Sequence, residues 1–408
     1  MKRSRKIWTE PSVGSNLGFV EAFNLWKLFS SQDGLNRGPI LAEFEKCLTD
    51  LTQVNYAVTT TSCSSALFLI PKLLNLKKED EVLIPANLFW TALAPLLERR
   101  CKTVIYDVDP LNLNASIKSI ESNLTNKTRA IYVQNFGGSP YNARLIKDLT
   151  NKAGIYLVED SAHGLGTLFD GKPIQSYSDI SSLSFSTLKN ITTLGEGGAL
   201  LTNDLNLFEN SKMLVESRVI GQNQDTILKQ TLHGLDNSLD KTFMRLGDSL
   251  SVDWCEIDEF GLTLRLGAPA ALVGISQLRK LKKFNTIRKN QAIRYKEEIT
   301  LLKLGSDNYV IGSENDSSNH LFNLYIDSSQ LRNTIIYELR HEIGYQVVNR
   351  FTPVSFQSVP RFFGHKPGQS PIYEKIFFNN LLSLPIGPRL SNYKQNQIIR
   401  TVNSVLIK

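Results

Sequence analysis

The sequence predicts an α/β fold in which helices cover both faces of a mostly parallel sheet, followed by a smaller C-terminal α+β domain. Between about residues 40 and 205, short apolar segments typical of buried strands alternate with segments whose apolar residues recur at helical spacing. Such alternation is typical of three-layer αβα proteins with a parallel sheet. The length of 408 residues suggests two or three domains and is enough to bury a large core.

Local apolar patterns predict the elements of the large domain. The predicted strands are Val82–Pro85, Val104–Tyr106, Ala130–Val133 and Ile155–Val158. Helical spacing is found in Arg144–Lys152 and, earlier, at Ile40, Leu41, Phe44, Leu48 and Leu51.

The second half of the chain begins with a different pattern. Residues 222–260 are polar and rich in Asn, Asp and Gln, which indicates a long excursion or lid. We therefore expect a large domain over residues 1–260 and a small domain over 261–408. The elements expected in the small domain are a helix from Gly267 to about Leu301, a strand at Phe322–Ile326, a helix capped by Ser328 or Ser329 that runs to Ile343 and stops at Gly344, and a final helix from about Ser391 to Leu406.

Composition excludes several classes of protein. Hydrophobic residues make up 41% and charged residues 21%, which is ordinary for a soluble globular protein. The net charge of +7 is a mild excess, and its two basic clusters, at 2–6 and 279–283, favour a solvated tail and an outer helix face over nucleic-acid binding. A modest positive field would also suit a substrate that carries phosphates.

Cysteine usage and hydropathy indicate a cytoplasmic protein without a metal centre. The four cysteines form no C-x-x-C pair and no tight Cys/His cluster, so neither disulfides nor zinc are expected. The basic N-terminus is not followed by the apolar segment of a secretory signal. No apolar run reaches the roughly 18 residues that a membrane helix needs.

Two segments of the large domain carry candidate chemistry. Val158-Glu159-Asp160 ends a predicted buried strand with two carboxylates, which would serve either as a cap or turn or as part of a site at the carboxyl edge of the sheet. Lys189 follows the apolar and hydroxyl-rich stretch Ser184–Leu188 and precedes the turn Gly195–Gly198, which leads into another predicted strand. This setting suits a partly desolvated amine, and desolvation favours the neutral, nucleophilic form of lysine.

Together these segments match the needs of pyridoxal 5′-phosphate (PLP) chemistry. That chemistry requires a lysine for the imine, a carboxylate that keeps the pyridine nitrogen protonated, and backbone amides and hydroxyls at a helix N-terminus for the phosphate. Thr61–Leu67 supplies a hydroxyl-rich turn that opens an apolar helix, and Ser184 offers a further phosphate contact. Phe89 follows a strand, where an aromatic ring either stacks on the pyridine or packs in the core.

The motifs resemble the DegT-type sugar aminotransferase family of fold type I PLP-dependent enzymes. The resemblance extends from Gly38-Pro39 to Ser383-Leu384-Pro385. Its most specific parts are Glu159–Gly164, Ser184–Lys189 and Gly195–Gly198, in this order and spacing. The resemblance implies the three-layer fold of PLP-dependent transferases and a homodimer with its site at the subunit interface.

The resemblance also implies roles for individual residues. Lys189 would form the imine and move the proton between substrate and cofactor, Asp160 would pair with the pyridine nitrogen, and His163 would lie near the ring hydroxyl. The other cofactor-binding positions implied by the family pattern are Ser62, Cys63, Ser64 and Ser184 at the phosphate, Phe89 at the ring, and Thr263 and Arg265 in a segment that reaches across the dimer interface.

Several positions depart from the family pattern. Cys63 stands where the family usually has Gly, and Thr263 where it usually has an Asn that reaches the partner's phosphate. Leu88 replaces a usual Thr, and Gln134 or Asn135 replaces a usual His. These departures surround the substrate and the phosphate, so they suggest an unusual substrate more than a lost reaction.

The resemblance leaves three functions to compare. The first is a PLP aminotransferase of polysaccharide biosynthesis that takes nitrogen from glutamate, passes through pyridoxamine phosphate, and aminates a nucleotide-linked keto-sugar. The second is a pyridoxamine-phosphate-dependent nucleotide-sugar dehydratase, which the local pattern around Ser62–Ala66 resembles, although that branch typically has His in place of Lys189. The third is a binding or regulatory protein without turnover, which the intact Lys189 and Asp160 argue against.

Overall fold

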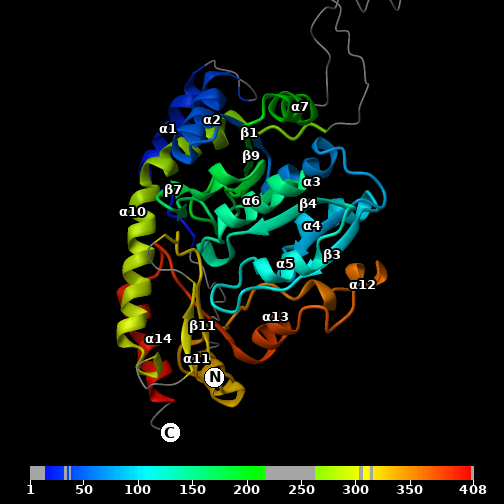
Figure 1. The fold of residues 1–408 in the computed structure, drawn as a ribbon. Helices are drawn as coiled ribbons and strands as arrows, with labels where there is room; N and C mark the ends of the chain where they lie inside the picture. Colours follow the sequence, from blue (N-terminus) through cyan, green and yellow to red (C-terminus); the bar gives the residue numbers. More distant parts are fainter. Residues whose placement is uncertain are drawn as a thin grey trace, which may run out of the picture.

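The computed structural model describes residues 14–31, 35, 38–216, 262–302, 307–312 and 316–405. It contains a large domain built on one wide sheet, with a smaller domain beside it (Figure 1). The excursion predicted at 222–260 lies outside the described residues. None of the described helices is both long and apolar enough to cross a lipid bilayer.

Seven strands form the central sheet, in the order β1-β9-β8-β5-β4-β2-β3. Their bounds in this order are Tyr56–Thr60, Gly198–Thr202, Ile180–Ser184, Tyr156–Asp160, Thr128–Gln134, Glu81–Pro85 and Lys102–Tyr106. Only β9 runs antiparallel to its neighbours, β1 and β8. The predicted, mostly parallel sheet is therefore confirmed, and the four strands predicted from apolar segments are β2 to β5.

Alternating side chains of the strands supply cores on both faces of this sheet. In β2, Val82 and Ile84 belong to one core, while Leu83 belongs to a core on the opposite face. The helices that cover the first face are α3 (Cys63–Leu73), α4 (Trp90–Glu98) and α7 (Leu205–Val215). The second face is covered by α2 (Pro39–Thr52), α5 (Ile117–Asn123), α6 (Ala143–Ala153) and the first half of α10 (Ala268–Glu298).

Short-range capping signals fix several of the helix ends. Ser62 caps α3 and Ser328 caps α11 (Ser329–Ile343), each by accepting a hydrogen bond from a backbone N–H three residues later. Gly344 ends α11 in the left-handed conformation, as predicted. Smaller elements are η1 (Phe136–Gly138), η2 (Ile174–Tyr177), β6 (Leu168–Phe169) and β7 (Lys172–Pro173).

The small domain packs helices against a three-stranded antiparallel sheet. The strands are β10 (Tyr309–Ile311), β11 (Phe322–Tyr325) and β12 (Leu381–Leu384), with β11 in the centre. The other elements after α10 are η4 (Thr300–Leu302), η5 (Val354–Phe356), α12 (Ser358–Phe362), α13 (Pro371–Lys375), η6 (Ile376–Asn380) and α14 (Asn392–Ser404). The α+β prediction is confirmed, and the last helix starts and ends close to its predicted bounds.

The helix α10 belongs to both domains. Its first half places Ala271 and Ile275 in the core of the large domain, together with Phe44 of α2. Its second half places Ala292 and Tyr295 in the core of the small domain. A helix that the sequence did not predict, α1 (Phe19–Ser30), packs beside the start of α10 (Figure 1). The domain boundary at 261 stays a prediction, and α10 begins just after it.

Candidate active site

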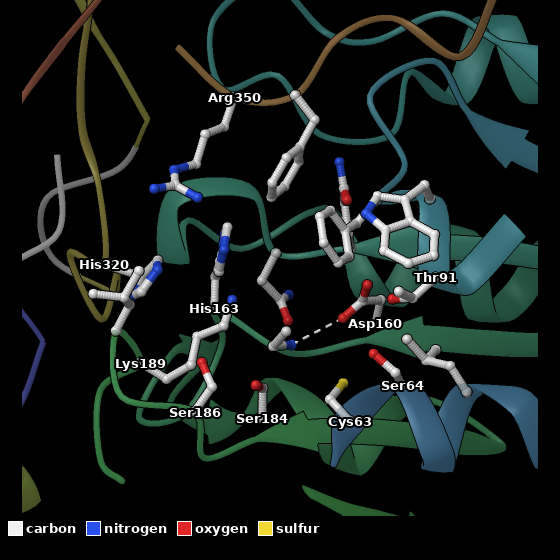
Figure 2. Close-up of a pocket in the computed structure, with 18 of the residues that line it drawn as sticks. Cys63, Ser64, Thr91, Asp160, His163, Ser184, Ser186, Lys189, His320 and Arg350 are labelled. Carbon is white, nitrogen blue, oxygen red and sulfur yellow. Dashed lines mark hydrogen bonds between the residues drawn. The ribbon is translucent and has the colours of Figure 1, made fainter. Parts of the chain in front are cut away.

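A cavity of about 500 Å³ opens at the carboxyl ends of β4, β5 and β8 (Figure 2). Parallel sheets bind ligands at this edge because the loops that follow the strands converge there. The starts of α3 and α4 form one wall. The small domain contributes His320, Arg350 and Phe351 to another wall of the cavity.

Asp160 and Lys189 line this cavity together. Asp160 is the last residue of β5, and the alternation of side chains turns it toward α3 while Glu159 faces the other side of the sheet. Its Oδ1 accepts a hydrogen bond from the N–H of Ala162 at 3.1 Å. Burial raises the pKa of the Asp160 carboxyl, and the charge of Lys189 and the N–H of Ala162 lower it in part.

Lys189 follows β8 in the connection that returns the chain to the sheet as β9. Backbone hydrogen bonds shape this connection, from Lys189 to Ser186 at 2.9 Å and from Thr187 to Gly195 at 2.9 Å. The predicted glycine turn is present. Gly195 in it has a φ of 122°, a backbone conformation that is strained for a residue with a side chain, which explains the glycine at this position. Burial lowers the pKa of the Lys189 ammonium, and Asp160 offsets part of that effect. The amine is therefore more readily neutral and nucleophilic than a surface lysine.

The start of α3 offers an anion site in the same cavity. Cys63 and Ser64 are its first two residues and line the cavity together with the hydroxyl group of Ser184. Within the described residues, the backbone N–H groups of Cys63 and Ser64 and the Ser64 hydroxyl have no hydrogen-bond acceptor. Free N–H groups at the positive end of a helix bind phosphate.

Cys63 does not block this anion site. Its thiol points to β8 and donates to the hydroxyl of Ser182 at 3.6 Å. Burial, followed by the charge of Asp160, raises the pKa of the thiol far above its usual range, so Cys63 is not a nucleophile. The side chain that departs from the family pattern is accommodated against the sheet.

A glycine allows β9 to approach the same turn. A Cβ atom on Gly198 would lie 2.4 Å from the amide nitrogen of Cys63 and 2.4 Å from the carbonyl carbon of Ser62. No side chain fits at these distances from backbone atoms. Gly198 is therefore required for the contact between β9 and the start of α3.

His163 and His320 lie side by side in the cavity wall near Lys189 (Figure 2). Nδ1 of His163 accepts the N–H of Gly137 at 3.3 Å, so the ring proton is on Nε2. Nδ1 of His320 lies 2.8 Å from Oδ1 of Asn190, whose Nδ2 donates to the carbonyl of Leu165 at 3.2 Å. This amide orientation makes His320 the donor through Nδ1 and leaves Nε2 as the acceptor of the ring.

The environment of both imidazoles favours their uncharged forms. Burial lowers the pKa of His163 well below its usual value, and the charges of Lys189 and Arg350 lower it further. Burial also lowers the pKa of His320 well below its usual value, and His163 and the nearby cations lower it further. The wall therefore presents one imidazole donor and one imidazole acceptor.

Phe89 lines the cavity at the start of α4. Its ring centroid lies 4.9 Å from that of Phe351 and 5.7 Å from that of Trp90. These rings form an apolar surface beside the polar groups of the site. The family-implied role of Phe89, stacking on a pyridine ring, stays a prediction.

Comparison with known proteins agrees with this geometry. Residues 21–403 match the model of the DegT/DnrJ/EryC1/StrS aminotransferase family. The chain belongs to this family. It is a family of PLP-dependent sugar aminotransferases, so the resemblance seen in the sequence is confirmed.

The chain also aligns with curated relatives over most of its length. The uncharacterized protein MJ1066 of Methanocaldococcus jannaschii is 30% identical over 378 residues, which are 91% of each chain. GDP-perosamine synthase of Escherichia coli O157:H7 is 25% identical and covers 90% of each chain.

Solved structures of aminotransferases share the fold. The aminotransferase TlmJ of Streptoalloteichus hindustanus is 25% identical, with a TM-score of 0.82 over 98% of this chain and 99% of its own. The sugar aminotransferase homologue Spr1654 of Streptococcus pneumoniae is 22% identical, with a TM-score of 0.80 over 98% of each chain, and its structures include a PLP form and a pyridoxamine-phosphate form. The predicted fold of PLP-dependent transferases is thus confirmed.

The described residues of this aminotransferase chain fit PLP. The cofactor has a phosphate, a pyridine nitrogen and an aldehyde. For the phosphate, the cavity provides the free amides at the start of α3 with Ser64 and Ser184. For the pyridine nitrogen it provides Asp160, and for the aldehyde Lys189. These donor and acceptor types match those that PLP sites require.

Three predicted cofactor-binding residues do not line the cavity of the single chain. The hydroxyl of Ser62 caps α3 by accepting the N–H of Ser65 at 3.0 Å. Thr263 forms an isolated β-bridge with Glu216, and Arg265 lies two residues further on. The predicted reach of Thr263 and Arg265 into a partner subunit stays a prediction.

Sequence reasoning missed His320, Arg350 and Phe351. They come from irregular segments of the small domain, whose local spacing carries no motif. One signal was available for His320, because it follows the polar run Ser317-Ser318-Asn319 directly before an apolar strand. A buried polar residue there needs a partner, and its partner is Asn190, the neighbour of Lys189.

Proposed function

We propose that the chain is a PLP-dependent aminotransferase that moves an amino group from glutamate to a nucleotide-linked keto-sugar. The observation that carries this proposal is that Lys189 and Asp160 line one cavity that also holds the free amides of α3. Membership of the aminotransferase family supports the reaction class. The name GDP-perosamine synthase supports a nucleotide-linked substrate.

Each residue of the site would have a defined task. When bound, PLP supplies an electron sink for the carbon that carries the amino group. Asp160 would hold a proton on the pyridine nitrogen, and its burial excludes water from that pair. Lys189 would move a proton at the substrate carbon through Nζ. His163 would donate Nε2–H to the ring hydroxyl.

Lys189 favours transamination over the dehydratase alternative. The branch of the family that dehydrates typically has His at this position, because an imine-forming lysine would return the cofactor to its lysine-bound form. We further propose that the enzyme acts as a homodimer, with Thr263 and Arg265 completing the partner's site. We also propose a cytoplasmic location.

Absorbance spectroscopy tests the proposed function. The purified protein loaded with PLP should show a visible band that glutamate bleaches, and a Lys189→Ala variant should lack the band. A screen of nucleotide-linked keto-sugars with glutamate, read by product mass, should then give an amino-sugar. A visible band that persists in Lys189→Ala would refute the assignment of Lys189, and a band that no amino acid changes would favour a binding protein.

A further inference from the structure

The charges of the cavity wall leave one cation without a role in the proposed function. Among the described residues that line the cavity, the acids are Asp160 and Glu196, and the cations are Lys189 and Arg350. The proposed function already assigns Lys189 to the cofactor aldehyde, and the lowered pKa values of both histidines favour their neutral forms. Arg350 is then the cation that remains beside the reacting groups.

The backbone around Arg350 is held in place on both sides. Before it, Nδ2 of Asn349 donates to the carbonyl of Leu381 in β12 at 2.8 Å. After it, the hydroxyl of Tyr373 accepts the N–H of Phe351 at 3.0 Å and donates to its carbonyl at 2.5 Å. Arg350 therefore projects from a fixed segment, and a preorganised group binds with less loss of entropy.

The guanidinium group of Arg350 points toward His163 and His320, on the side of the cavity where Lys189 enters (Figure 2). Its positive charge contributes to lowering the pKa of both imidazoles and of Lys189, after the larger effect of burial. The field of Arg350 thus reaches the place where an incoming amine reacts.

The two substrates of an aminotransferase differ in the charge next to the reacting carbon. An amino acid carries a carboxylate on the carbon that bears its amino group, so this carboxylate must lie close to Lys189 when the amines exchange. A keto-sugar has no charged group on its reacting carbon, and its phosphates are several bonds away. A guanidinium fork matches a carboxylate in shape and charge.

We propose that Arg350 is a specificity-determining residue that binds the carboxylate of the amino donor and acts only in the donor half of the reaction. This inference rests on the proposed aminotransferase function and deepens it. It identifies how one cavity accepts an anionic amino acid and a sugar in turn.

Single-turnover absorbance with the PLP-loaded protein measures the donor half alone. We would compare the wild type with Arg350→Gln, which removes the charge, and Arg350→Lys, which keeps the charge without the fork. Arg361→Gln is the matched control, because Arg361 is an exposed arginine of α12 outside the cavity. The substrates are L-glutamate and propylamine, a primary amine without a carboxylate.

In Arg350→Gln, we expect the glutamate concentration for half-maximal bleaching to rise about 30-fold or more, as when one partner of a desolvated charge pair is removed. Arg350→Lys should lie between this variant and the wild type, and Arg361→Gln should match the wild type. The slow reaction with propylamine should be equal in all four proteins. The sugar half, started from the pyridoxamine-phosphate form, should be unchanged.

Other outcomes overturn the inference. If Arg350→Gln weakens the reaction with glutamate and with propylamine equally, or weakens neither, Arg350 does not bind the donor carboxylate. A loss confined to the sugar half would assign Arg350 to the substrate phosphates. If Arg350→Gln does not fold, as judged by circular dichroism, Arg350→Lys carries the comparison.

A binding measurement separates failure of this inference from failure of the proposed function. Glutarate has two carboxylates and no amine, so calorimetry can follow its binding without any turnover. We expect glutarate to bind the PLP-loaded wild type and Arg361→Gln at least about 10-fold more tightly than Arg350→Gln. If the wild type does not bleach with any amino acid, the proposed function fails, while glutarate binding still decides the role of Arg350.

Discussion

The imidazole rings of His163 and His320 stack in the wall of the cavity, with centroids 4.1 Å apart and ring planes inclined by 28°. Their hydrogen bonds place the ring protons on different nitrogens, Nε2 in His163 and Nδ1 in His320. The stack therefore offers a hydrogen-bond donor and an acceptor side by side. Neither ring needs a charge to do so.

We predict that neither histidine titrates between pH 6 and 8, because burial and the surrounding cations lower both pKa values well below 6.5. Asn190→Asp would place a carboxylate opposite Nδ1 of His320 and raise its pKa toward neutrality. Nitrogen NMR of labelled histidine, with pH titration of both proteins, measures this difference. Titration of either ring near pH 6.5 in the wild type would contradict the neutral pair.

We predict that Asp160→Asn still binds PLP and forms the visible band but reacts with glutamate at least about 100-fold more slowly. The amide cannot hold a proton on the pyridine nitrogen, and loss of one preorganised electrostatic contact costs roughly this factor. Single-turnover bleaching measures the rate. A variant with unchanged rate would remove Asp160 from the proposed chemistry.

We predict that Gly198→Ala weakens PLP binding about 10-fold or more and lowers the free energy of unfolding by about 1–3 kcal/mol. Its Cβ would lie 2.4 Å from the amide nitrogen of Cys63, so β9 or the start of α3 must move. Gly267→Ala is the control, since a Cβ there meets no atom closer than 3.7 Å. Spectroscopic PLP titration and urea unfolding give the two quantities.

We predict that Glu159→Gln stabilises the protein increasingly as the pH rises from about 4.5 to about 8. Burial raises the pKa of Glu159 to about 8, and the nearby side chains of Ser161 and Ser178 only partly offset this. In this range the folded chain keeps a proton that the unfolded chain releases, so the wild type loses stability as the pH rises, by a few kcal/mol in total. Glutamine is neutral throughout and avoids that loss.

Urea unfolding at pH 5 and pH 8 tests the Glu159 prediction. The two proteins should be similar in stability at pH 5 and differ most at pH 8. Equal stabilities at both values would mean that Glu159 is charged in the folded protein. That result would require a cation that compensates it.

Local signals in the sequence were sufficient for most of the fold. Strands such as β2 and β5 are buried on both faces, and their continuous apolar runs reflect that environment directly. Helix ends at Ser62, Ser328 and Gly344 follow from interactions within one turn. Lys189 and Asp160 were predictable because each ends or follows a strand of the same sheet edge.

Features that depend on distant packing were not predictable in this way. In α1, large apolar side chains such as Phe19 (83% exposed) and Trp26 (63% exposed) do not lie in a core. The apolar residues of this helix therefore form no buried face that a sequence pattern could reveal. Instead, Glu21 anchors α1 to α10, since it accepts hydrogen bonds from Ser276 and Gln277 at 2.8 and 2.9 Å. These partners are more than 250 residues away in the chain.

The same limit applies to the cavity wall. His320 joins the site through Asn190, 130 residues earlier in the chain. No spacing rule relates residues of two domains, so this pairing follows only from the folded arrangement. Arg350, the second basic residue that lines the cavity, belongs to the same class of missed residues.

The shared helix α10 limits how this protein can be divided for expression. A gene split at the predicted boundary, residue 261, would remove Ala271, Ile275 and Leu281 from the apolar cover over Phe185. The first fragment would expose that surface and the second would carry an apolar helix face without its partner. We therefore expect each fragment to aggregate when produced alone and the two to recover folding only when they are synthesised together.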